Sequence, residues 1–171
     1  MEGIENGMMT SVVMKRSSDR CFRHRRYANL AKLAFLGSAR QWYENVAQKL
    51  VLQNITNTDL RLIPLDHPLT APEQTSYEVL PNYVNVLQEF PDASLDWVLV
   101  DGHYRTHCTR SSFNKLKPLG YLMVDDSQFW QSPQQLGIPT DWPRVSHTSN
   151  GIKMTSIWQK PGEHLSDPPE E

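Results

Sequence analysis

Two apolar segments of this chain end in carboxylate side chains. Residues 94–100 lead to Asp101, and one helix length later the segment 116–124 leads to Asp125 and Asp126. Short apolar runs bounded by turn residues predict buried strands, and a helix-sized gap between two of them predicts a right-handed β-α-β unit. Ligands of such sheets bind at the carboxyl ends of the strands, so we expect these carboxylates to share a crevice.

The side chains at these two strand ends could do several kinds of chemistry. Asp101 either serves the site or caps the backbone of the next helix, and Gly102 allows a sharp turn after it. Asp125 and Asp126 repel each other unless a cation or a hydrogen-bond donor offsets them, and on a strand only one of them would face the crevice. His103 is either a general base for an acceptor hydroxyl or amine, or a surface or capping histidine.

The composition is that of one globular α/β domain. The 171 residues suffice for a single core, and a net charge of −2 argues against nucleic acid or an anionic membrane surface as a partner. No segment has the apolar length of a membrane span, and the N-terminus lacks the basic-then-apolar order of a signal peptide. Cys21 and Cys108 fit reduced thiols, so we expect a cytoplasmic protein.

Three regions differ in composition. Residues 1–39 are basic and poorly defined, with an arginine cluster that is either an anion-binding patch or a solvated face, and with a weak helix expected over 27–36. Residues 40–161 hold the α/β domain, and residues 162–171 form an acidic tail that we expect to be disordered. Within the domain the patterns predict helices over 41–53, 77–90 (interrupted near Pro81) and 106–116. They predict strands over 60–65, 94–101 and 116–126, the last with a turn at 117–120. A hairpin of 144–148 with 153–159 is expected around Asn150-Gly151.

Three stretches of the domain, residues 41–46, 96–104 and 116–126, together resemble a class I S-adenosylmethionine-dependent methyltransferase in order and spacing. They look like the helix after the second strand, the fourth strand with its catalytic-side motif, and the fifth strand with the turn before it. Leu119 replaces the first glycine of that turn. The resemblance implies a Rossmann-like, mostly parallel α/β sheet that ends in an antiparallel hairpin. It also implies S-adenosylmethionine as cofactor and methyl transfer to a small-molecule acceptor.

The same resemblance suggests roles for single residues. Asp101, Gly102 and Tyr104 would border the cofactor, although Tyr104 could instead pack its helix onto the sheet. Asp101, His103 and Asp125 would serve catalysis, with His103 as the base.

The three aspartates also suggest a metal. Asp101, Asp125 and Asp126 are similar to the oxygen-rich site of the catechol-type O-methyltransferases, which implies Mg²⁺ as a further cofactor. Helix caps and turn hydrogen bonds are the alternative role for these side chains.

The chain also departs from the family, which grips its cofactor with a Gly-rich loop after the first strand and an acid at the end of the second. No apolar strand precedes Gly3 and Gly7, which could be a cofactor-binding remnant of that loop. The acid would fall near Gly37, in a stretch without carboxylates between Asp19 and Glu44. We therefore expect a fold that is truncated at its N-terminus, and the unpaired sheet edge that this leaves could support a homodimer.

The sequence also fits two other functions. The missing first strand and ribose acid favour a degenerate, non-catalytic protein of methyltransferase fold. The run 122–127 resembles the strand and metal-binding acidic pair of a nucleotide-sugar glycosyltransferase. Phe129, Trp130 and Trp142 are either an aromatic acceptor pocket or core residues.

Overall fold

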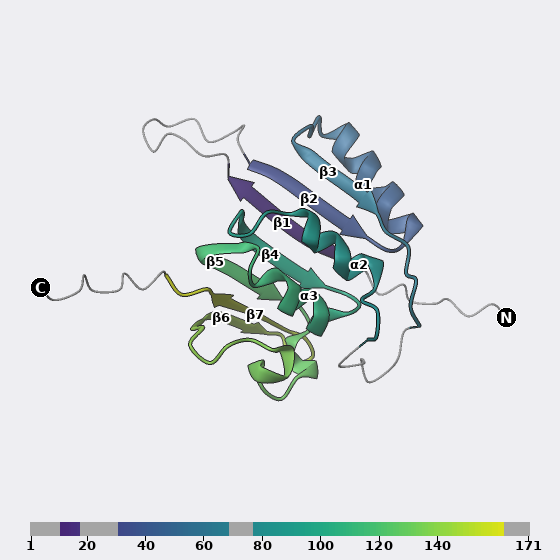
Figure 1. The fold of residues 1–171 in the computed structure, drawn as a ribbon. Helices are drawn as coiled ribbons and strands as arrows, with labels where there is room; N and C mark the ends of the chain where they lie inside the picture. The colour runs from purple at the N-terminus through teal and green to yellow at the C-terminus, as the bar shows by residue number, and fades with distance from the viewer. Residues whose placement is uncertain (1–10, 18–30, 69–76, 163–171) are drawn as a thin grey trace, which may run out of the picture.

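The chain folds around one seven-stranded mixed sheet, in which the strand order is β3-β2-β1-β4-β5-β7-β6 (Figure 1). The computed structural model describes residues 11–17, 31–68 and 77–162, so Gly3, Gly7 and nearly all of the expected tail lie outside the described residues. The strands are β1 (Ser11–Ser17), β2 (Ala31–Gly37), β3 (Thr58–Leu62), β4 (Leu95–Asp101), β5 (Leu116–Val124), β6 (Arg144–Ser149) and β7 (Met154–Gln159). The α-helices are α1 (Arg40–Leu52), α2 (Asn82–Asn85) and α3 (Arg105–Ser112), and the 3-10 helices are η1 (Val86–Glu89), η2 (Ser127–Phe129) and η3 (Pro133–Leu136).

The strand directions confirm a Rossmann-like sheet. β2 is parallel to β3, and β4 is parallel to β5, while β7 runs antiparallel to both β5 and β6. β1 lies between β2 and β4 and is antiparallel to both of them. All described strands except β1 and β7 therefore point the same way, and the sheet ends in the expected antiparallel hairpin.

Two predictions for the N-terminal part are wrong. The helix expected over 27–36 does not form in its described part, because residues 31–37 are β2. A short apolar run is compatible with either a helix or a strand. Residues 31–37 form a strand because they pair with β1 on one side and with β3 on the other. The second wrong prediction is that the first strand is missing. β1 occupies its place between β2 and β4, although β1 runs antiparallel to both. Because β1 pairs with both β2 and β4, this position offers no unpaired strand edge for a homodimer.

The stronger local signals predict the elements around the site correctly. α1, β4, β5 and the hairpin around Asn150-Gly151 lie where the sequence places them, and Gly151 has a positive φ of 88°. α3 also forms, but it ends at Ser112 rather than at residue 116. The helix expected over 77–90 is two short pieces, α2 and η1, which begin after Pro81. β5 already includes the expected turn at 117–120, and Leu119 takes a left-handed φ of 63°. No helix among the described residues is long and apolar enough to cross a membrane.

The core lies on one face of the sheet and fixes the two strands that carry the carboxylates. Val98 and Val100 of β4 and Leu122 and Val124 of β5 alternate with half-buried residues and are at most 1% exposed. They belong to one cluster with apolar side chains of α2, η1, α3 and η3. This packing holds the carboxyl ends of β4 and β5 side by side.

Candidate functional site

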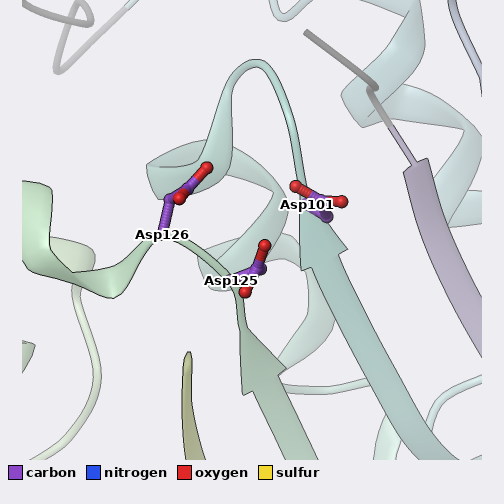
Figure 2. A group of neighbouring side chains, drawn as sticks. All are labelled: Asp101, Asp125 and Asp126. Carbon is purple, nitrogen blue, oxygen red and sulfur yellow. The ribbon is translucent and has the colours of Figure 1, made fainter. Parts of the chain in front are cut away.

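The carboxylates that were predicted to share a crevice do lie together. The parallel register pairs Val100 of β4 with Val124 of β5, and the N–H of Asp125 donates to the carbonyl oxygen of Val100 at 3.0 Å. Asp101 and Asp125 thus leave the sheet at the same edge. One carboxylate oxygen from each of Asp101, Asp125 and Asp126 lies within 4.8 Å of the other two (Figure 2).

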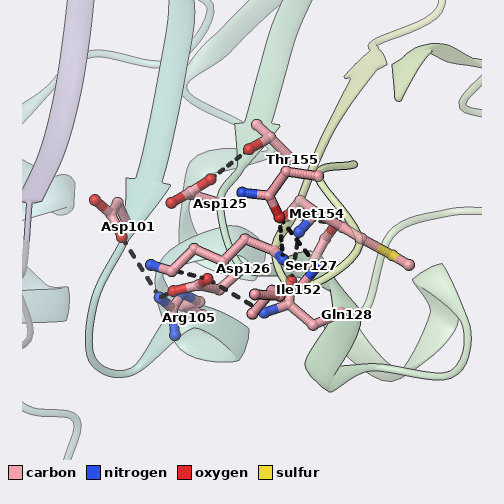
Figure 3. A network of polar contacts seen from close by, with 11 residues as sticks. Asp101, Arg105, Asp125, Asp126, Ser127, Gln128, Ile152, Met154 and Thr155 are labelled. Carbon is pink, nitrogen blue, oxygen red and sulfur yellow. Dashed lines mark hydrogen bonds and ion pairs between the residues drawn. The ribbon is translucent and has the colours of Figure 1, made fainter. Parts of the chain in front are cut away.

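Both Asp125 and Asp126 bring their carboxylates to this group, whereas strand geometry predicted that only one would. β5 ends at Val124, so the strand alternation no longer applies to the next two residues. Asp126 has a left-handed φ of 53° and is 2% exposed. The hydroxyl of Thr155, from β7, donates to Oδ1 of Asp125 (Figure 3). A non-glycine residue keeps such a backbone conformation only where its surroundings hold it, and the side chain of Asp126 is held by Arg105, Gln128 and Lys153.

Two cations that the sequence analysis missed offset the carboxylates. Nη2 of Arg105 lies 2.9 Å from Oδ2 of Asp126 and 3.4 Å from Oδ1 of Asp101 (Figure 3). Nζ of Lys153 lies 3.3 Å from Oδ1 of Asp126. The two positive charges leave the group of three carboxylates with one negative charge in excess. The signal that could have revealed this partner is a basic residue close after Asp101, where the next helix begins.

The carboxyl groups differ in how easily they lose their charge. Burial raises the pKa of Asp101, and the neighbouring charge of Asp125 raises it further, whereas Arg105 lowers it and offsets only part of the increase. Burial acts in the same direction on Asp126, but hydrogen bonds from Gln128 and from its lysine partner, together with the charge of Arg105, hold its pKa below the usual value. Asp126 is therefore the firmly ionised member of the group, and Asp101 is the one most easily protonated.

The donor set does not fit Mg²⁺. The metal prefers carboxylates that remain free to coordinate it, with water completing an octahedron. Here the guanidinium of Arg105 bridges Asp101 and Asp126, and Asp126 also accepts from Lys153. A metal ion between these carboxylates would have to displace Arg105, so the prediction of a Mg²⁺ cofactor gains no support.

The loop after β4 makes the sharp turn that was expected. Gly102 has a φ of 116°, and Tyr104, the residue before α3, has a left-handed φ of 54° and makes no side-chain cap bond. Tyr104 is 2% exposed, and its hydroxyl donates to the carbonyl oxygen of His67 at 2.9 Å, which favours its packing role. Burial and the charge of Arg105 lower the pKa of His103, which keeps its imidazole neutral.

The three aromatic residues after β5 do not form one pocket. Trp142 is 8% exposed and packs on Phe113, with ring centroids 5.0 Å apart, as a core residue. Phe129 and Trp130 instead lie near Arg105, whose Cζ is 5.9 Å and 6.0 Å from their ring centroids.

The end of β2 lacks the ribose acid and has no room for one. Gly37 is the last residue of β2, at the place predicted for the acid, and it is buried. A Cβ atom on Gly37 would lie 2.2 Å from Cε3 and Cζ3 of Trp42, so the indole ring fills the space of a side chain. Gly3 and Gly7 precede β1 in the sequence, whereas the family's loop follows its first strand.

No family model and no curated protein sequence matches the chain. Among solved structures, it is similar to the "Putative methyltransferase yhhF" of Escherichia coli, with a TM-score of 0.54 and 12% identity over 76% of this chain and 64% of that one. The chain thus spans less than two thirds of that protein. It also matches "putative methylase HI0767" of Haemophilus influenzae (TM-score 0.49, 13% identity, 75% and 71% covered) and "a putative type 11 methyltransferase" of Sulfolobus solfataricus (0.35, 11%, 74% and 72%). At 12% identity the likeness to the Escherichia coli structure shows the fold alone, and it confirms the Rossmann-like methyltransferase fold expected from the sequence.

Proposed function

We propose that the chain binds S-adenosylmethionine over the carboxyl ends of β4 and β5 and supports transfer of its methyl group to a small-molecule acceptor in the cytoplasm. The observation that carries this proposal is the convergence of three carboxylates with one negative charge in excess at that edge. S-adenosylmethionine, when bound, supplies an electrophilic methyl group on a cationic sulfonium. An excess negative charge on half-buried and buried carboxylates attracts such a cation.

The residues of this edge divide the work between binding and proton transfer. Asp101 is half-buried and less tied up by cations than Asp126, so it is the carboxylate best placed to face the ligand. His103 is neutral because its pKa is lowered, and a neutral imidazole can accept the proton of an acceptor hydroxyl or amine. Methyl transfer needs mainly positioning, so we expect the base to matter less than the carboxylate.

A specific observation favours a second candidate, a non-catalytic protein of the same fold. Trp42 fills the space beside Gly37 where a ribose-binding acid would stand, and β1 runs in the reverse direction. Both features weaken the grip on the nucleoside part of the cofactor. The glycosyltransferase hypothesis keeps only the Asp125-Asp126 pair in its favour, and Asp126 is engaged by two cations.

Calorimetric titration with S-adenosylmethionine separates the two candidates. For an enzyme we expect saturable binding that Asp101→Asn weakens about tenfold or more, since it removes a charge-assisted contact. Asp96→Asn is the matched control, because Asp96 is also a half-buried carboxylate of β4 but lies at the other end of the strand. There its Oδ1 pairs with Nζ of Lys117 at 3.3 Å. Transfer of a tritiated methyl group to a panel of small hydroxyl and amine compounds then tests turnover. Absence of binding would favour the non-catalytic protein.

A further inference from the structure

A cavity of about 340 Å³ lies beside the acidic site, between the β6–β7 hairpin and the segment that joins β5 to β6. Trp158, Ser156 and Met154, which alternate along β7, all line it. Trp130 and Pro133 line it from the joining segment. The volume falls within the range of small-molecule sites. An engineered cavity of about 150 Å³ binds benzene, so this one has room for about two aromatic rings.

A β-bulge brings two basic side chains of β6 to this cavity. Arg144 pairs with Trp158, and His147 pairs with Ser156. Arg144 and His147 are three residues apart along β6, whereas their partners are only two residues apart along β7. In a regular strand, residues three apart point to opposite faces. The irregularity between Arg144 and Ser146 adds one residue, so both Arg144 and His147 share the face that lines the cavity.

A chain of hydrogen bonds links Nδ1 of His147 to Ser156 and Ser127. The hydroxyl of Ser127 donates to the carbonyl oxygen of Met154 at 3.2 Å, which uses its only proton. The hydroxyl of Ser156 lies 3.0 Å from that of Ser127, and Nδ1 of His147 lies 3.0 Å from Ser156. We infer that, with the Ser127 proton on Met154, Ser156 donates to Ser127 and Nδ1 of His147 donates to Ser156. In the neutral ring, Nε2 of His147 is then a bare acceptor, without a hydrogen-bond partner in the described part of the chain.

Arg144 supplies the second polar feature of the cavity. Its guanidinium makes no ion pair or hydrogen bond with any side chain that the structure describes, although most other cations near the site are paired. A planar guanidinium of this kind suits a carboxylate, which it can bind through two parallel hydrogen bonds. The lining thus offers an anion site, a hydroxyl-recognising nitrogen and two indole rings.

We propose that this cavity binds a hydroxylated aromatic carboxylate. Its rings would lie against Trp130 and Trp158, its carboxylate would pair with Arg144, and its hydroxyl would donate to Nε2 of His147. The inference goes beyond the proposed methyl transfer and depends neither on S-adenosylmethionine nor on turnover.

Titration calorimetry of the full chain with three probes tests the proposal. 6-Hydroxy-2-naphthoate carries both polar groups, 2-naphthoate lacks the hydroxyl, and 2-naphthol lacks the carboxylate. We expect 6-hydroxy-2-naphthoate to bind most tightly, with one molecule per chain. Arg144→Gln should weaken both carboxylates about tenfold and leave 2-naphthol unchanged. His147→Ala should weaken the two hydroxyl compounds about fivefold and leave 2-naphthoate unchanged.

Arg40→Gln is the matched control, because Arg40 is an exposed arginine at the start of α1, away from the cavity. Both Arg144 and His147 are exposed, so their variants should fold, and thermal melts verify this. The proposal is overturned if the wild-type chain binds none of the probes, if either variant weakens all three equally, or if Arg40→Gln acts as Arg144→Gln does.

Nitrogen-15 spectra test the hydrogen-bond chain separately. The neutral ring of His147, assigned by its loss in His147→Ala, should carry its proton on Nδ1. Ser156→Ala removes the acceptor and should shift the proton toward Nε2. A proton on Nε2 in the wild-type chain would remove the acceptor role from the proposal and so contradict it.

Discussion

Replacing Arg105 with methionine tests whether its ion pairs hold the acidic site together. The side chains of Arg105 and Asp126 are only 5% and 3% exposed, and the guanidinium also reaches Asp101. Removing one partner of a buried ion pair costs about 3–5 kcal/mol, because the other charge stays buried without compensation. Asp126 keeps Lys153, which is 60% exposed and so a weak replacement. We therefore expect a loss near the lower limit, about 3 kcal/mol, or a decrease of about 6–12 °C in Tm for a chain of this size.

Urea denaturation of wild type and variants measures this loss. Adding Asp126→Asn to Arg105→Met should recover at least half of it, since the uncompensated charge is removed as well. Lys117→Met serves as control, because it breaks a pair with Asp96 whose side chains are 27% and 30% exposed, and it should cost less than about 1 kcal/mol. If Arg105→Met costs no more than Lys117→Met, the electrostatic account of the site is refuted.

Three further outcomes follow from contacts already described. Gly37→Ala should destabilise the chain by about 1–3 kcal/mol in urea titrations, because its Cβ meets the ring of Trp42, and the same change should cost nothing once Trp42→Ala is present. Asp101→Asn should raise the urea midpoint at pH 7, because burial and then Asp125 raise the pKa of Asp101, and a carboxyl with a raised pKa opposes folding once it is charged. That gain should fade as the pH falls toward 3.8, the ordinary value for an aspartate, and a loss at pH 7 would contradict it. Millimolar MgCl₂ should leave Tm unchanged in thermal melts, because cations of the chain already occupy the acidic group; an increase would show that a metal binds there.

The parts of the site that the sequence predicted are those with strong local signals. Asp101 and Asp125 each follow an apolar run at the place where the chain must turn, and parallel pairing then brings the two ends together. The hairpin at Asn150-Gly151 is similarly local. By contrast, β2 was not recognised, because the run Ala31–Gly37 suits a helix as well, and only its pairing with β1 and β3 makes it a strand.

The cations of the site show a different limit of sequence analysis. Arg105 could have been found, since it follows Asp101 closely in the sequence, at the start of the next helix. Lys153 could not, because it comes from the far hairpin and meets Asp126 only when β7 pairs with β5. The same holds for Arg144 and His147, whose shared face depends on a bulge that no local pattern indicates.

The two ends of the expected cofactor site are unequal, and this makes the proposed binding testable in its parts. At the ends of β4 and β5 the excess negative charge favours the sulfonium, whereas at the end of β2 the indole of Trp42 occupies the place of a ribose contact. If charge drives binding, S-adenosylhomocysteine, which lacks the sulfonium charge, should bind about tenfold more weakly than S-adenosylmethionine, and Asp101→Asn should abolish the difference. Raising the salt concentration should reduce the preference as well, because a partly exposed charge is screened. Equal calorimetric affinities of the wild-type chain for the two compounds would mean that the carboxylates do not face the sulfonium, even if both compounds bind.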